Sequence, residues 1–226
     1  MELSLSLGAE DVPARPQDVH QLVIAGWTGR DRDALEQHIG ELEALGVKRP
    51  STTPIFYRVS ANRATLASHI EVTGGESSGE VEFVLLATGG KLWVGVGSDH
   101  TDRAAESYDV TASKQMCEKP IASVFWDYTD VAPHWDSLWL RSYIEENGER
   151  VLYQQGSVLE MLDPLVLIAR YTGKANLPEG CMMFCGTLST REGVRYSDGF
   201  EIEIEDPVLG RRISHSYAVE RLPFSE

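Results

Sequence analysis

Basic residues are scarce in this sequence. Only 20 Lys and Arg stand against 35 Asp and Glu, so the formal net charge is −15 at pH 7 and the pI is near 4.8. A surface of that sign repels the phosphates of nucleic acids and of anionic lipids. We therefore expect no nucleic-acid partner and no role at a membrane surface.

Cysteines and long apolar runs are also few. The three cysteines, Cys117, Cys181 and Cys185, form no CxxC pair, and their odd number argues against a disulfide framework. The first residues lack the basic and apolar regions of a secretory signal peptide. Even the apolar stretch 161–171 is interrupted by an Asp-Pro pair, so no segment has the length that a bilayer requires. These absences predict a cytoplasmic protein with reduced thiols.

Three common signatures are missing as well: the phosphate-binding P-loop, the dinucleotide-binding GxGxxG and the zinc-binding HExxH. Function must therefore rest on less specific groups of polar residues. With 42% hydrophobic residues, a chain of 226 residues can bury one large core. We predict a single domain over residues 1–226.

The pattern of apolar residues predicts a mainly β protein with some helix. A short strand and an amphipathic helix occupy about 20–46, where apolar residues recur at helical spacing at Leu35, Ile39 and Leu42. Asp31 or Asp33 can cap the start of this helix, and Gly46 suits its end. A β core follows over about 54–222, with strands predicted at 55–60, 68–72, 79–88, 91–99, 182–190, 200–206 and 213–222. In the strand 200–206, alternation places the glutamates in water.

Carboxylates stand at the start of one of these strands and at the end of the next. Glu80 and Glu82 are two residues apart, so they project from one face of a strand, roughly 6.6 Å apart at about 3.3 Å per residue. Asp99 follows the next strand across a tight TGGK turn and can bring a third carboxylate. Three carboxylates suit Mg²⁺, Mn²⁺ or Ca²⁺ better than zinc. The alternative is that the glutamates form only a solvated strand edge.

Other candidate residues form weaker patterns. His38 and Glu41 are neighbours on one helix face, where the carboxylate can orient the imidazole as a base, or both can be ordinary surface residues. Lys119 can polarise a carbonyl near a metal, or be a solvated lysine. Gly186 and Thr187 can offer a backbone N–H and a hydroxyl to an anionic oxygen, or form only a turn.

Taken in chain order, these pieces resemble the fumarylacetoacetate hydrolase superfamily. The matching motifs are HIGE from His38, EVE from Glu80, Asp99 in GSDHTDR, Lys119, and GTLSTREG from Gly186. The resemblance spans roughly 20–222 and is closest to a bacterial branch of unknown function. It implies a mixed β-sandwich or roll and a homodimer, which the five Trp and the apolar face of the closing strands also favour.

The resemblance also implies the roles of the residues. Glu80, Glu82 and Asp99 would hold Mg²⁺ or Mn²⁺. The catalytic groups would be His38, Glu41 and Lys119, and the substrate-binding groups Arg103, Gly186 and Thr187. The implied activity is hydrolysis of a C–C bond or decarboxylation of a small oxo acid, of the acylpyruvate or β-keto acid type. Tautomerisation or hydration on the same scaffold, a non-catalytic protein that binds a small anion, and a purely structural subunit are the alternatives.

Overall fold

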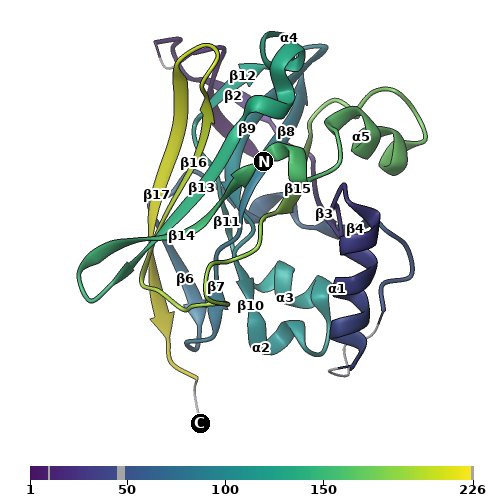
Figure 1. Cartoon of the computed structure of the whole chain (residues 1–226). Coiled ribbons are helices and arrows are strands. Elements are labelled where there is room, and N and C mark those ends of the chain that lie inside the picture. Colours follow the sequence, from purple (N-terminus) through teal and green to yellow (C-terminus); the bar gives the residue numbers. More distant parts are fainter. Residues whose placement is uncertain (10, 45–48, 225–226) are drawn as a thin grey trace.

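Two β-sheets and a few short helices make up the protein (Figure 1). The computed structural model describes residues 1–9, 11–44 and 49–224, and only the backbone at residues 38 and 41–44. Strands predominate and helices are few, so the predicted α+β class is confirmed.

The larger sheet is mixed and lies at the centre of the protein. Its spatial order is β2 (Arg15–Asp18), β1 (Glu2–Leu7), β12 (Val124–Asp127), β9 (Lys91–Ser98), β8 (Val81–Thr88), β15 (Cys181–Thr187), β3 (Gln21–Gly26) and β4 (Ile55–Val59). The pairs β1/β12 and β15/β3 are parallel, and the other neighbours are antiparallel. All eight residues of β8 are buried, which explains why this strand reads as a nearly continuous apolar run.

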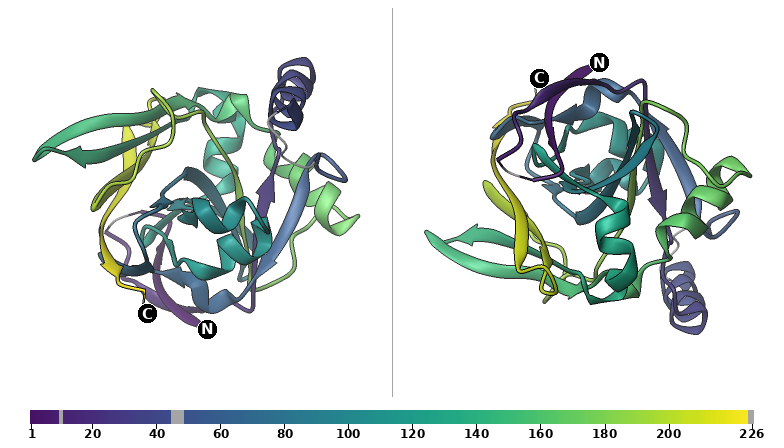
Figure 2. Two further views of the ribbon diagram at one scale, coloured as in Figure 1. Left: turned by 90° about the horizontal axis from the view of Figure 1, so that it is seen from below. Right: turned by 90° about the horizontal axis from the view of Figure 1, so that it is seen from above.

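A second sheet packs against the first. It contains β14 (Glu149–Ser157), β13 (Trp139–Glu146), β16 (Gly199–Asp206), β17 (Arg211–Leu222) and β6 (His69–Thr73), in that order. Two short pairs, β7 (Ser77–Ser78) with β10 (Thr101–Asp102) and β5 (Ala64–Thr65) with β11 (Lys119–Pro120), complete the strands. Viewed end on, the sheets curve around an interior, and the β13/β14 hairpin extends away from it (Figure 2).

An aspartate precedes each α-helix of the described residues. The helices are α1 (Arg32–Ala44), α2 (Arg103–Glu106), α3 (Val110–Met116), α4 (Tyr128–Val131) and α5 (Pro164–Thr172), with 3₁₀ turns at Ala61–Arg63, Ala132–Ser137 and Val158–Glu160. The carboxylates of Asp31, Asp102, Asp109, Asp127 and Asp163 accept backbone N–H groups of the first turn at 2.8–3.0 Å. The predicted helix with its Asp31 cap is thereby confirmed. Within the described ranges, no helix is both long and apolar enough to cross a membrane.

The glutamates of the strand 200–206 differ from the prediction at one position. Phe200, Ile202 and Ile204 are buried, as alternation predicts. Glu203 on the opposite face is only 2% exposed, however, because Arg141 of β13 (2.9 Å) and Arg212 of β17 (3.4 Å) cover its carboxylate. The prediction that Glu203 lies in water is therefore wrong.

The predicted site residues on or directly beside β8, β9 and β15 lie at one end of the central strands of the larger sheet. Because β9 and β8 are antiparallel, the end of β9 lies beside the start of β8. The end of β15 adjoins the same point, since Thr187 pairs with Glu82, and the parallel β3 ends next to β15. Helices α2 and α3 follow β10 at the same end of the sheet. The fold thus brings together segments that are more than one hundred residues apart.

Candidate metal centre

Three carboxylates meet where β8 begins and β9 ends. Glu80 precedes β8, Glu82 is its second residue, and Asp99 directly follows β9. The N–H of Asp99 donates to the carbonyl of Glu80 at 2.9 Å, which fixes the two segments in register. One oxygen from each side chain lies within 4.8 Å of the others. The convergence that the sequence predicts across the TGGK turn is therefore present.

Asp99 is fully buried between two lysines. Lys114 on α3 donates to its Oδ2, and the Nζ of Lys119 on β11 lies 3.2 Å from its Oδ1. Burial acts to raise the pKa of Asp99, but the two ammonium charges outweigh burial and hold this pKa well below its usual range. Asp99 is therefore a carboxylate at neutral pH.

The two lysines differ in their surroundings. Burial lowers the pKa of Lys114, but the charges of Asp99 and Glu80 more than offset it, and the net pKa is raised. For Lys119 burial prevails, and its pKa is lowered. The side chain of Lys119 is completely buried, and its Nζ also donates to the carbonyl of His100. Lys119, predicted to be catalytic, thus contacts Asp99 and the backbone behind it.

Glu80 is paired with Arg103, the first residue of α2. The two side chains lie 2.9 Å apart, and Arg103 also lies 2.8 Å from Glu106. Burial acts to lower the pKa of Arg103, but the charges of the two carboxylates outweigh burial and raise this pKa, so the guanidinium stays charged. Arg103, predicted to bind substrate, is therefore shared between two carboxylates and holds Glu80 in place.

Gly186 holds Glu82. Its N–H donates to Glu82 Oε2 at 2.7 Å, at an irregularity in the β8/β15 ladder between Phe184 and Thr187. Gly186 has a φ of +96°, and a Cβ there would lie 1.8 Å from Oγ1 of Thr28, so only glycine fits. Burial, and then the charges of Asp99 and Glu80, raise the pKa of Glu82 well above its usual value.

Thr187 is tied into the same ladder. Its hydroxyl donates to the carbonyl of Val81 at 2.8 Å and accepts from Gln154 at 2.9 Å. Gln154 is buried in the second sheet and also accepts from the N–H of Val81 and donates to the carbonyl of Leu188. Thr187 and Gly186, both predicted to bind substrate, therefore use their donors to hold the strand that carries Glu80 and Glu82.

The neighbour of Asp99, His100, is the centre of a buried network. Its Nε2 lies 2.9 Å from Oγ of Ser77 and its Nδ1 lies 3.0 Å from the hydroxyl of Tyr217. Burial, with the charges of Lys119 and Arg103, lowers the pKa of His100 to about 3, so the ring is neutral.

Ser77 lies in GESSG (75–79), which matches the GxSxG pattern of serine hydrolases. Here the serine is 4% exposed on a two-residue strand, and no helix follows it. The Ser77–His100 pair therefore serves to join β7 to the loop behind Asp99.

Lys114 is the basic residue of the site that sequence reasoning misses. It lies in the last turn of α3, where helical periodicity alone does not indicate which way it faces. Its Nζ lies 5.9 Å from the ring centroid of Tyr57 on β4. Trp27, which hydrogen-bonds Tyr57, has a φ of +57°, a conformation rare outside glycine that concentrates at functional sites.

His38 and Glu41, the predicted catalytic pair, lie on α1. Their side chains are outside the described residues, so the dyad stays a prediction. Figure 2 shows that α1 stands apart from the sheets. A cleft of about 420 Å³ lies at its first turns, lined by Trp27, Leu35 and Leu162 among others.

The residues present fit a hard divalent cation. The three carboxylates offer oxygen ligands at close range, and the fold holds each of them from behind by a lysine, an arginine or a backbone N–H. Burial, and then the charges of Asp99 and Glu80, raise the pKa of Glu82, and a cation would relieve the crowding of like charges.

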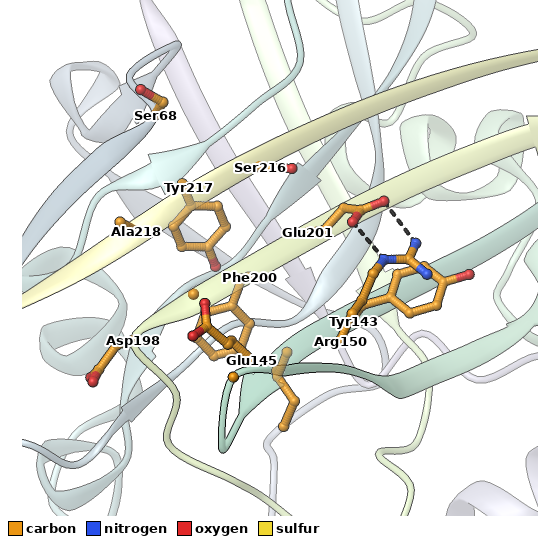
Figure 3. A pocket seen from close by; sticks show the side chains of 13 residues that line it. Ser68, Tyr143, Glu145, Arg150, Asp198, Phe200, Glu201, Ser216, Tyr217 and Ala218 are labelled. Atoms are coloured by element: carbon orange, nitrogen blue, oxygen red, sulfur yellow. Dashed lines mark hydrogen bonds and ion pairs between the residues drawn. The ribbon is translucent and has the colours of Figure 1, made fainter.

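A second hollow, a groove of about 560 Å³, lies on the five-stranded sheet (Figure 3). In it Arg150 makes two 2.8 Å contacts with Glu201 and lies over the ring of Tyr143. None of the three carboxylates lines this groove. Tyr217 reaches from it to His100, so the groove is adjacent to the network behind the centre rather than part of the centre.

The curved sheets and the carboxylates at the end of a hairpin define a protein with the fumarylacetoacetate hydrolase fold, as the sequence predicts. One similar structure, described as a fumarylacetoacetate isomerase/hydrolase from Oleispira antarctica, is 18% identical, with a TM-score of 0.67, and covers 96% of this chain and 100% of its own. A fumarylacetoacetate hydrolase family protein from Yersinia pestis CO92 is 17% identical, with a TM-score of 0.66 and coverage of 96% and 100%. The chain itself belongs to the family described as "Protein of unknown function (DUF2848)", which matches residues 25–217.

A third similar structure contains ligands. It is a 2-keto-3-deoxy-D-arabinonate dehydratase complexed with magnesium and 2,5-dioxopentanoate, 15% identical, with a TM-score of 0.62, covering 96% of this chain and 78% of its own. No curated protein matches the sequence significantly.

Proposed function

We propose that this protein is a divalent-metal-dependent enzyme that acts on a small oxo acid. The observation that carries the proposal is the convergence of Glu80, Glu82 and Asp99 within 4.8 Å, with the Lys114 ammonium beside them. Mg²⁺ and Mn²⁺ are the ions that such a set of oxygen ligands suits best. The dehydratase of the same fold, bound to magnesium and a dioxo acid, supports this substrate class.

The bound cation would supply a Lewis acid for adjacent oxo and carboxylate oxygens of the substrate. The chain's own residues divide the remaining work. Arg103 and Gly186 hold two of the carboxylates, and Lys119 holds the third from behind. Lys114 is buried as well, with 7% of its side chain exposed, but it contacts Asp99 and lies near Glu80, and its ammonium can stabilise negative charge that develops on a substrate oxygen.

His38 and Glu41 would move the proton. In this proposal α1 closes over the cleft at its first turns, excludes bulk water and brings the imidazole to the substrate. Glu41 orients the ring and supports its charged form. Hydrolysis of a C–C bond needs a water activated in this way, whereas decarboxylation needs only stabilisation of the electron pair that the departing CO₂ leaves behind.

The first test measures the metal and the reaction together. Thermal shift with Mg²⁺ and Mn²⁺ should show a rise in Tm, because a ligand at one hundred times its Kd stabilises the folded state by about 2.7 kcal/mol. Purified protein should then turn over an acylpyruvate or oxaloacetate in a metal-dependent manner. Tautomerisation or hydration products would redirect the reaction type. Metal binding without any turnover would favour the non-catalytic alternative.

A variant locates the site. Glu80→Gln keeps the size of the side chain and removes one ligand charge, so the metal response and the activity should both be lost while the protein stays folded. Glu71→Gln on β6 is the matched control, because this glutamate is exposed and pairs with Glu220 in the five-stranded sheet. If Glu80→Gln retains the wild-type metal affinity, the triad is not the metal site.

A further inference from the structure

The two lysines at Asp99 occupy opposite sides of its carboxylate. Lys119 contacts Oδ1, has no exposed surface, and its other partner is the carbonyl of His100. Lys114 contacts Oδ2 and lies 3.9 Å from Oε2 of Glu80. Lys119 therefore faces the protein interior, and Lys114 faces the other ligands.

This placement puts the Lys114 ammonium beside two of the three carboxylates of the candidate metal centre. Oxygen ligands approach Mg²⁺ at about 2.0–2.1 Å and Ca²⁺ at about 2.3–2.6 Å. A cation that binds Oδ2 of Asp99 and Oε2 of Glu80 would use the same two oxygens that Lys114 contacts. At that separation an ammonium and a divalent ion repel each other strongly in a poorly solvated site.

A partner for a displaced Lys114 ammonium is already close by. Its Cα is fixed by α3, but four rotatable bonds separate Cα from the ammonium. The ring of Tyr57 lies 5.9 Å from Nζ, a distance at which an aromatic face attracts a cation. Lys119 has no comparable alternative, because its ammonium is enclosed by Asp99 and the His100 carbonyl.

We propose that Lys114 competes with the metal ion for Oδ2 of Asp99 and that metal binding releases its ammonium toward Tyr57 and the substrate oxygen. Lys119 is then a positioning residue, which keeps Asp99 oriented in both arrangements. The inference rests on the proposed metal-dependent function. It adds that binding of the cation and availability of the lysine are linked, so that the substrate meets a free ammonium only after the metal has bound.

The test compares two variants that remove the same charge from the same carboxylate. Isothermal titration at one fixed pH would give the Kd of Mg²⁺ and Mn²⁺ for wild type, Lys114→Met and Lys119→Met, each checked for folding by circular dichroism. Removal of a competing ammonium should tighten metal binding by about tenfold or more in Lys114→Met. Lys119→Met should not tighten to that degree, because the loss of orientation of Asp99 opposes the gain from the lost charge.

Three outcomes would count against these ideas, and they are distinguishable. Unchanged or weaker binding in Lys114→Met overturns the competition, and so does equal tightening in both variants, which would reduce it to general electrostatics. No binding of either ion to wild type overturns the proposed function itself.

A measurement on the wild-type protein covers the case in which a variant does not fold. In NMR spectra of ¹³C,¹⁵N-lysine-labelled protein, added Mg²⁺ should shift the terminal signals of Lys114 and leave those of Lys119 nearly in place. Equal shifts, or none at Lys114, would overturn the inference.

Discussion

The buried side chain of Gln154 joins the second sheet to the strands of the candidate metal centre, and its hydrogen bonds allow a quantitative prediction. Its side-chain oxygen accepts from the N–H of Val81 and the hydroxyl of Ser142, both at 2.9 Å. Its amide nitrogen donates to Thr187 Oγ1 at 2.9 Å and to the carbonyl of Leu188 at 2.6 Å. The side chain is fully buried, so no water can replace these bonds without rearrangement.

Gln154→Leu preserves the approximate volume and removes all four bonds. The hydroxyls of Ser142 and Thr187 lose one bond each, and Thr187 keeps its bond to the carbonyl of Val81. The Val81 N–H and the Leu188 carbonyl lose a partner inside the core. At about 1–3 kcal/mol for each buried unsatisfied group, the variant should lose about 2–6 kcal/mol of unfolding free energy. That is a large share of the free energy of unfolding of a typical domain, which is about 5–15 kcal/mol.

Urea unfolding followed by circular dichroism measures this loss. Gln155→Leu is the control, because Gln155 is the next residue on β14 and is exposed, so its replacement should change stability by about 0.5 kcal/mol or less. Because Val81 lies between Glu80 and Glu82, the stabilisation by Mg²⁺ should also shrink in Gln154→Leu. A loss below about 1 kcal/mol would refute the reasoning from unsatisfied groups.

Three further predictions concern single positions. Gly186→Ala should cost about 3 kcal/mol or more in urea unfolding, since its Cβ would lie 1.8 Å from Thr28 Oγ1, whereas Gly90→Ala, with positive φ but open space, should cost about 1 kcal/mol. Burial acts to raise the pKa of Asp206, but hydrogen bonds and the charge of a neighbouring histidine hold this pKa below 3.8. Asp206→Asn should therefore be destabilising at pH 7, and the difference in unfolding free energy from wild type should fade as the pH drops below 3.8. A constant difference down to about pH 3 would contradict this. His38→Ala should lower kcat by roughly 10² to 10⁴ with little change in metal Kd, and an unchanged kcat would remove the dyad from the mechanism.

The carboxylate triad could be predicted because its geometry is local. Two residues apart on a strand means one face, and a two-residue turn returns the chain to the starting edge. Gly89 and Gly90 both have positive φ, as that turn requires, and Asp99 arrives beside Glu80. No long-range information was needed to bring the three carboxylates together.

The lysines could not be assigned in the same way. Lys119 was chosen from its place in a motif, yet it is completely buried behind Asp99. Lys114 lies in a short helix whose orientation depends on packing against β4 and β10, which periodicity does not encode. Buried lysines are rare, so the ordinary alternative at Lys119 was a solvated surface residue, and nothing in the sequence singled out Lys114.

The N-terminal strand shows a signal that was present and missed. Residues 2–7, ELSLSL, alternate as a strand does, and they form β1 beside β12.

The homodimer, by contrast, stays a prediction. The apolar face of the closing strands, which favoured it, is packed inside the protein at Ile202, Ile204 and Ile213. Size-exclusion chromatography with light scattering would decide the oligomeric state.

Glu82 is the carboxylate of the candidate metal centre whose charge is least compensated by neighbouring residues. Asp99 has two ammonium groups and Glu80 has Arg103, but within the described ranges no ion pair is formed by Glu82, which accepts the N–H of Gly186. Two ionised carboxylates with oxygens within 4.8 Å of each other repel by about 3.5 kcal/mol or more at an effective dielectric constant of about 20.

Glu82→Gln should therefore have opposite effects with and without metal. Burial and the neighbouring carboxylates raise the pKa of Glu82 above its usual 4.5, so ionising it opposes folding as the pH rises past that value. In EDTA the variant should unfold at a higher temperature than wild type near pH 8, with the difference vanishing below pH 4.5. With Mg²⁺ the order should reverse, because only wild type offers the third carboxylate. A variant less stable than wild type in EDTA, or one that still responds fully to Mg²⁺, would show that Glu82 is structural and that the cation, if bound, lies elsewhere.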